Sequence, residues 1–92
     1  MGLEYTTLRV GGIIIYASKL GNYCGINSGV IIGNNKGAND IPTIGNNCML
    51  NAGCKIFGNI VIGDNVVVEA NSVVNKNVQS NSVVVGVPFK VI

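Results

Sequence analysis

Aliphatic residues recur at every sixth position along most of this chain. The series consists of Leu8, Ile14, Leu20, Ile26, Ile32, Ala38, Ile44, Leu50, Ile56, Ile62, Val68 and Val74. The stretch "TIGNNCMLNAGCKIFGNIVIGDN", residues 43–65, shows the period without a gap, and the series ends at Ser80. Six is the period of neither an α-helix, which repeats about every 3.6 residues, nor a simple strand, which repeats about every two.

A second row of small or apolar residues stands two positions before members of the first row. It consists of Ser18, Cys24, Val30, Cys48, Cys54, Ile60, Val66 and Ser72. Side chains two apart on a strand share a face, so each six-residue unit predicts a short strand with two inward side chains. Glycine and asparagine fill positions between, as in "GNY", "GNN" and "GDN", and they tolerate the positive φ of a sharp corner. Strand and corner repeated in constant register predict an all-β solenoid.

The period lapses between Gly33 and Ile44, in the segment "NNKGANDIPT". Lys36 and Ala38 fall where inward apolar residues are expected. We therefore expect one domain over residues 1–92, with coils over about 8–33 and 44–79, an excursion loop over 34–43 and a C-terminal segment over 80–92. A tolerated surface insertion would explain the loop. Loops on rigid scaffolds also collect binding groups, so it is a candidate functional element.

The composition fits a small folded domain and excludes several classes of function. Apolar residues make up 48% of the chain and charged residues 11%, which argues against disorder. No apolar run reaches the roughly 18 residues of a membrane span. The net charge is +2 without a basic cluster, which argues against a nucleic-acid surface. The start, "MGLEYTTLRV", lacks the features of a signal peptide, which predicts a cytoplasmic protein.

The cysteines are predicted to be structural. Cys24, Cys48 and Cys54 all belong to the second inward row, where a thiol acts as a small apolar group. A reactive thiol would need an exposed, electropositive site. The chain contains no histidine and the cysteines lack the spacing of a zinc site, so no metal is expected.

The hexads and several longer segments resemble a known family. The segments are "VIIGN", "IPTIGNNCMLNAGCKIFGNIVIGDN", "EANSVVNKNV" and the terminal "VVVGVPFKVI". They look like the carboxy-terminal half of the serine O-acetyltransferases and the related polysaccharide O-acetyltransferases. Those enzymes belong to the hexapeptide-repeat, left-handed β-helix family, whose members wind three hexads per triangular coil. The upstream "GGIIIYASKLGNYCGINSG" is similar to the family's segment there, so the resemblance covers nearly the whole chain.

The resemblance implies transfer of an acetyl group from acetyl-CoA to the hydroxyl of serine or a sugar. It also implies a homotrimer with sites between neighbouring subunits. Ala52, Gly53 and Ala70 match family positions where small corner residues let the backbone approach the pantetheine arm. Corner geometry alone would also require small residues, so both explanations stay open.

Polar residues that match family positions complete the implied cofactor site. Lys76 and Lys90 match basic positions near the nucleotide end of the cofactor, and lysine binds phosphate as a point charge. A solvated turn lysine is the alternative for each. Asn34, Asn35 and Lys36 stand where the family opens its loop with residues that could donate hydrogen bonds to the cofactor.

The chain departs from the family at the catalytic base. Arg9 stands where the family has a histidine that accepts the proton of the acceptor hydroxyl, and Ile41 stands where the serine acetyltransferases have a second histidine. Arginine stays protonated and cannot accept a proton. Glu4, Asp40 or Tyr5 could substitute, and nothing in the sequence favours one of them. Two functions follow: an O-acetyltransferase with an impaired or altered base, or a non-catalytic β-helix that binds acyl-CoA or serves as an assembly module.

Overall fold

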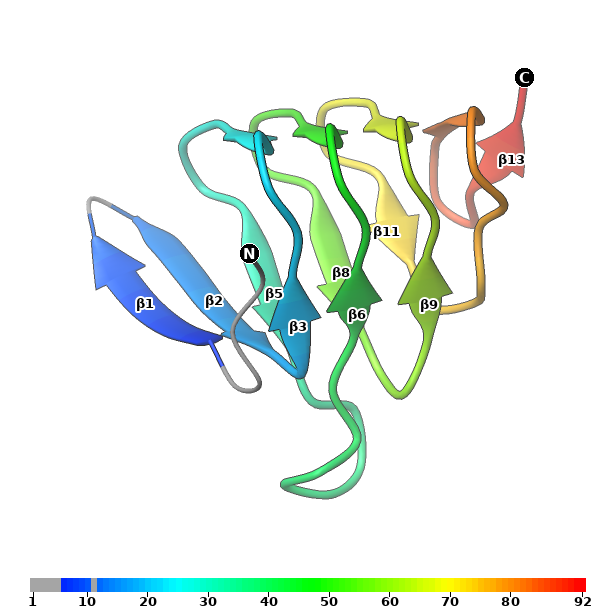
Figure 1. Cartoon of the computed structure of the whole chain (residues 1–92). Coiled ribbons are helices and arrows are strands. Elements are labelled where there is room, and N and C mark those ends of the chain that lie inside the picture. Colours follow the sequence, from blue (N-terminus) through cyan, green and yellow to red (C-terminus); the bar gives the residue numbers. More distant parts are fainter. Residues whose placement is uncertain (1–5, 11) are drawn as a thin grey trace.

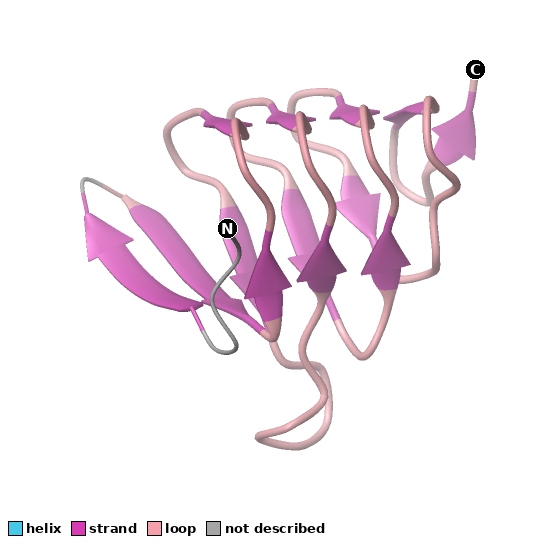
Figure 2. Cartoon of the chain, in the orientation of Figure 1, coloured by secondary structure: helices cyan, strands magenta, loops and turns pink. Residues whose placement is uncertain are grey.

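The computed structural model describes residues 6–10 and 12–92, with side chains described from Gly12 onward. The described residues form strands and turns and contain no helix (Figure 2). The strands are β1 (Thr6–Val10), β2 (Ile13–Ala17), β3 (Lys19–Leu20), β4 (Gly25–Ile26), β5 (Ile31–Gly33), β6 (Thr43–Ile44), β7 (Met49–Leu50), β8 (Lys55–Phe57), β9 (Val61–Ile62), β10 (Val67–Val68), β11 (Val73–Val74), β12 (Val83–Val85) and β13 (Lys90–Val91).

Three sheets enclose a triangular solenoid (Figure 1). We name them by their members: sheet A is β1-β2-β5-β8-β11, sheet B is β3-β6-β9, and sheet C is β13-β12-β10-β7-β4. Each of the first three coils contributes one strand to each sheet, and the last coil contributes strands only to sheets A and C. Equivalent strands of successive coils pair in parallel, as in Ile44 opposite Ile62. The coils wind in the left-handed sense (Figure 1), which confirms the predicted left-handed parallel β-helix.

The core is the inward row of the six-residue repeat. Ile32, Ile44, Leu50, Ile56, Ile62, Val68 and Val74 have no exposed surface. The second row lies beside them, with Val30, Cys48, Cys54, Val66 and Ser72 buried. Burying short aliphatic side chains in register excludes water from the whole length of the prism, which is the main stabilising contribution to such a fold.

The register departs from the six-residue period at two places. In the first coil Ile15, not Ile14, faces the core, because β2 is an extended five-residue strand between β1 and β5 in which Ile15 pairs with Ile32. In the last coil Val78 takes the inward place and forms an isolated bridge with Ile62. The inward row then resumes at Val84, so the series continues beyond Ser80.

Both ends of the chain fold back in the antiparallel sense. β1 pairs antiparallel with β2, so Leu8 continues the sequence period without belonging to a parallel coil. At the other end β13 pairs antiparallel with β12, and Phe89 packs against the core. Within the terminal "GVPFKVI", Phe89 therefore covers part of the end of the hydrophobic core.

Candidate functional site

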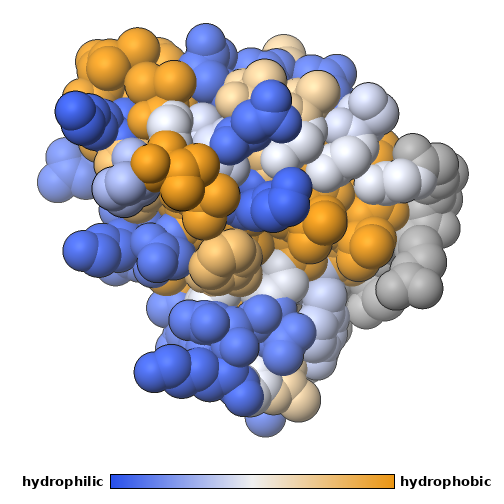
Figure 3. Space-filling view, turned by 180° about the vertical axis from the view of Figure 1, so that it is seen from behind, coloured by the Kyte–Doolittle hydropathy of each residue, from blue (hydrophilic) through white to orange (hydrophobic). Residues whose placement is uncertain are grey.

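The candidate site is the outer face of sheet A together with the two edges that border it. Figure 3 views the molecule from this side and shows apolar surface broken by polar groups, with a hydrophilic projection at the bottom. The projection is the excursion loop, residues 34–42, which leaves the solenoid between β5 and β6 (Figure 1). The opposite edge is the corner between sheets C and A, where the small residues lie.

The corner between sheets C and A carries Ala52, Gly53 and Ala70 on neighbouring coils. Ala52 and Ala70 are on the surface, and the Ala52 carbonyl accepts the N–H of Asn71 at 3.0 Å. Gly53 has a φ of +74°, and a Cβ on it would overlap Oδ1 of Asn71. The close stacking of coils is therefore enough to explain why residue 53 is glycine. The two surface alanines, in contrast, leave the backbone of this corner open to an extended ligand.

Two charged groups lie at this corner, and the sequence did not single them out. The ammonium of Lys55 donates a hydrogen bond to the Gly53 carbonyl at 3.0 Å. Glu69 Oε1 accepts one from the side-chain amide of Asn51 at 3.1 Å. Lys55 occupies an outward position of β8. The alternation of inward and outward positions along that strand is the only sequence signal that could have identified this residue.

The loop is tied to the solenoid by specific hydrogen bonds. The hydroxyl of Tyr16, on β2, donates to the Ala38 carbonyl at 2.7 Å. The carboxylate of Asp40 accepts the N–H of Lys36 at 3.2 Å and that of Asn59 at 2.7 Å. Lys36 and Ala38 are exposed, as expected for a segment that leaves the coil.

The structure divides the predicted cofactor residues between different edges. Asn34, Asn35 and Lys76 lie at the corner between sheets A and B, and all three are exposed. The side chain of Asn35 rests beside Gly58, whose added Cβ would meet Asn35 Cβ at 3.6 Å. Lys90 is also exposed, but it lies on β13 in sheet C. The two lysines therefore do not share an edge within one chain.

The predicted catalytic positions lie partly outside the described residues. Arg9 belongs to β1 and its backbone is opposite Ile14, but its side chain is outside the described part, and Glu4 and Tyr5 lie wholly outside it. Ile41 is 2% exposed, so this replacement for the second histidine is a core residue. Both carboxylate oxygens of Asp40 accept backbone N–H groups.

The thiols of Cys48 and Cys54 behave as core groups, whereas Cys24 is half-buried. Burial raises the pKa of Cys54 to about 11, and burial also raises the pKa of Cys48. The Cys48 thiol donates to the Gly63 carbonyl at 3.1 Å, and the Cys24 thiol donates to the Gly45 carbonyl at 3.3 Å. Cys48 and Cys54 are therefore poorer nucleophiles than an ordinary thiol, which agrees with a structural role for these two residues.

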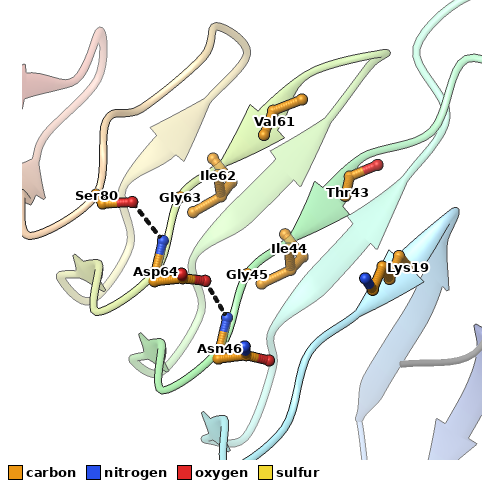
Figure 4. A pocket seen from close by; sticks show the side chains of 10 residues that line it. All are labelled: Lys19, Thr43, Ile44, Gly45, Asn46, Val61, Ile62, Gly63, Asp64 and Ser80. Carbon is orange, nitrogen blue, oxygen red and sulfur yellow. Dashed lines mark hydrogen bonds between the residues drawn. The ribbon is translucent and has the colours of Figure 1, made fainter. Parts of the chain in front are cut away.

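A shallow trough of about 190 Å³ lies on the outer face of sheet B (Figure 4). Lys19, Thr43 and Val61 stand along one side, and Asn46, Asp64 and Ser80 along the other. Oδ1 of Asp64 accepts the Asn46 N–H, and Ser80 Oγ accepts the Asp64 N–H, each as a rung between coils. The trough contains none of the predicted site residues. Its polar groups are already used in the hydrogen bonds that stabilise the corner between sheets B and C, so we do not take the trough as the site.

Two other kinds of feature are missing from the described residues. No group of three or more histidine, cysteine, aspartate or glutamate side chains there could hold a metal ion. Nor does that part of the chain contain a helix with the length and hydropathy needed to span a membrane.

Comparisons with known proteins agree with this architecture. Residues 41–76 match the family described as "Bacterial transferase hexapeptide (six repeats)". The chain is 41% identical over 85 residues to a serine acetyltransferase of Synechococcus elongatus, an alignment that covers 90% of this chain and 35% of that protein.

The comparison with solved structures also finds serine acetyltransferases. The serine acetyltransferase of Neisseria gonorrhoeae in complex with serine superposes with a TM-score of 0.73 at 43% identity, over 76% of this chain and 29% of that one. A serine acetyltransferase in complex with CoA superposes with a TM-score of 0.67 at 33% identity, over 75% and 28%. The chain spans about a third of the length of the relatives it matches.

Proposed function

Because this chain belongs to the hexapeptide-repeat acyltransferase family, we propose that it forms the β-helix of an acetyl-CoA-dependent O-acetyltransferase. The acceptor is a small hydroxyl compound, serine or a sugar, and the chain acts as a homotrimer. The observation that carries the proposal is the 43% identity and TM-score of 0.73 with a serine acetyltransferase solved with serine. Another matched serine acetyltransferase was solved in complex with CoA, which supports the same donor.

The reaction needs an extended cofactor held beside an acceptor hydroxyl. The hydroxyl oxygen bonds to the thioester carbon, the carbon–sulfur bond breaks, and the hydroxyl proton ends on the departing CoA sulfur, which leaves as the free thiol. In our proposal the open corner at Ala52, Gly53 and Ala70 lies along the pantetheine arm, because small side chains let backbone groups reach its amides. Lys55, at the same corner, adds a cation beside this path.

The remaining proposed contacts belong to the nucleotide half of CoA. Lys76 and Lys90 supply positive charge for its phosphates, and Asn34 and Asn35 supply amide donors. Within one chain, Lys76 lies at the corner between sheets A and B, and Lys90 lies on sheet C. A cofactor between two neighbouring subunits of a trimer could meet Lys76 of one chain and Lys90 of the next.

A second function is a β-helix that binds acyl-CoA or only assembles, without turnover. The observation in its favour is the absence of histidine from the whole sequence, with Arg9 at the family's catalytic position. A positioned general base typically contributes roughly 10²–10⁴-fold to the rate. Its loss would leave the binding contacts in place and remove most of the turnover.

One experiment separates the two functions. CoA binding is measured by calorimetry, and acetyl-CoA turnover is measured with serine and with sugar acceptors. We expect the wild-type chain to bind CoA and turn over slowly, and Arg9→His to raise the rate by up to about 10²–10⁴-fold. The rescued rate should rise with pH through about 6.5, where histidine loses its proton. Fast wild-type turnover would show that another base acts, and no CoA binding would overturn the proposal.

A further inference from the structure

The carboxylate of Asp40 joins the excursion loop to two separate parts of the backbone. Oδ2 accepts the N–H of Lys36, inside the loop, at 3.2 Å. Oδ1 accepts the N–H of Asn59, in the corner after β8, at 2.7 Å. Hydrogen bonds to an ionised acceptor are stronger than neutral ones. One side chain thus sets both the internal fold of the loop and its position on the next coil.

The main chain of Asp40 adds two contacts of the same kind. Its N–H donates to the Gly37 carbonyl at 3.0 Å, and its carbonyl accepts the N–H of Asn35 at 3.3 Å. Asn35 and Lys36 are thereby fixed at the backbone while their side chains stay exposed. A loop held in this way presents its polar side chains with less conformational freedom left to lose when a ligand binds.

These contacts favour a positioning role for Asp40 over a role as general base. A base must offer an oxygen to the acceptor hydroxyl at hydrogen-bond distance. In Asp40 each carboxylate oxygen is directed at a main-chain N–H group. Ile41, which follows directly, is 2% exposed, so the chain is buried again immediately after Asp40.

We propose that Asp40 is a positioning residue that holds residues 34–36 in the conformation that binds CoA. The inference rests on the proposed function, since it assigns these residues to the cofactor. When the binding-competent conformation is only a fraction of the population, the apparent Kd rises by the inverse of that fraction. A loop that is ordered for about a tenth of the time after loss of the carboxylate would bind CoA about tenfold more weakly.

The test compares two aspartates that make the same kind of contact. Asp64 Oδ1 accepts the N–H of Asn46 at 2.7 Å in the corner between sheets B and C, away from the loop. Asp40→Ala and Asp64→Ala each remove a carboxylate that accepts a backbone N–H across coils. Amide hydrogen exchange by NMR is measured at Lys36 and Asn59, CoA affinity by calorimetry, and stability by thermal unfolding.

We expect Asp40→Ala to speed exchange at Lys36 and Asn59 and to raise the Kd for CoA about tenfold. Asp64→Ala should leave both unchanged. Asp40→Asn retains one acceptor oxygen and should give a smaller change in the same direction, which keeps the test decisive if the alanine variant does not fold. A purely structural role would lower the melting temperature without this selective loss of CoA affinity.

Three results would overturn the inference. The first is unchanged exchange at both amides in a folded Asp40 variant. The second is an equal loss of CoA affinity in the Asp64 variant. The third is loss of turnover in Asp40→Asn with unchanged CoA affinity and exchange, which would make Asp40 the base. A wild-type chain that binds no CoA is a different outcome, because it removes the proposed function while the exchange rates still show whether Asp40 holds the loop.

Discussion

At the scale of single residues, the corners decide whether the coils can stack. Asn47, Asn65, Asn71 and Asn81 all have positive φ values between 57° and 65°. Asparagine is among the few residues other than glycine that adopt this conformation readily. Tyr23 takes the same conformation with φ of 59° while 88% exposed, an exception that the sequence pattern did not predict.

The glycines of the corner between sheets B and C give a residue-scale prediction. A Cβ on Gly45 would overlap Oδ1 of Asp64 and approach the Gly63 carbonyl oxygen to 2.6 Å. A Cβ on Gly37, in the loop, would meet nothing within 4 Å. We expect Gly45→Ala to lower the free energy of unfolding by about 1–3 kcal/mol through overpacking. Gly37→Ala should be neutral or slightly stabilising.

Urea unfolding at one fixed protein concentration measures both variants. The fixed concentration matters because association with other copies shifts the apparent stability. Equal urea midpoints for Gly45→Ala and the wild type would contradict this prediction. They would show that neighbouring coils can move apart at this corner without loss of stability.

At the scale of elements, the inward rows were predictable and their local offsets were not. The six-residue spacing predicted the buried row from Ile32 to Val74, because every parallel rung repeats the same environment. It placed Ile14 inward, which is wrong, since antiparallel pairing with β1 extends β2 and turns Ile15 to the core. The six-residue spacing also ended the inward series at Ser80. In the structure the core continues with Val78 and Val84.

The C-terminal segment gives the prediction at this scale. Phe89 is half-buried and packs against the core, whereas Val87, two residues earlier, is 68% exposed. Truncating a fully buried phenylalanine costs roughly 3–5 kcal/mol, and a half-buried one should cost less. We expect Phe89→Ala to lower the free energy of unfolding by about 1–3 kcal/mol. Val87→Ala should change it by less than about 0.5 kcal/mol.

Denaturant midpoints again provide the measurement. Similar losses in the two variants would mean that the end of the solenoid is closed by the pairing of β12 with β13 and not by the aromatic side chain. The slope of the transition should stay the same in both, since neither change alters the surface exposed on unfolding very much.

At the scale of the whole molecule, the site depends on contacts that no sequence spacing encodes. Tyr16 reaches Ala38 and Asp40 reaches Asn59 only because the coils stack in register. The sequence motifs could mark two candidate elements. The loop stands out because it interrupts the six-residue repeat, and the corner of small residues stands out because it recurs with that repeat. The motifs could not show that the Lys55 ammonium turns back onto the Gly53 carbonyl, or that Lys76 and Lys90 do not share an edge.

Exposed aliphatic side chains gather on one face of the whole molecule. The outer face of sheet C presents Met49, 45% exposed, and Val85, 36% exposed. The terminal Ile92 continues this surface at 75% exposed. Apolar surface of this kind is typical of protein–protein contacts, and closed rings are the usual result for identical subunits. We therefore expect sheet C to form part of the contact in the proposed trimer.

The prediction compares two apolar residues of similar exposure on different faces. Met49 lies on the outer face of sheet C, and Val61, 53% exposed, lies on sheet B. Light scattering at micromolar concentration should give about three times the chain mass of 9.5 kDa for the wild type. Met49→Glu should shift the mass toward the monomer, because an unpaired carboxylate in an apolar contact loses its hydration without a partner. Val61→Glu should remain trimeric. A monomeric wild type would remove both the trimer and any site between subunits, and dissociation by Val61→Glu alone would move the contact to sheet B.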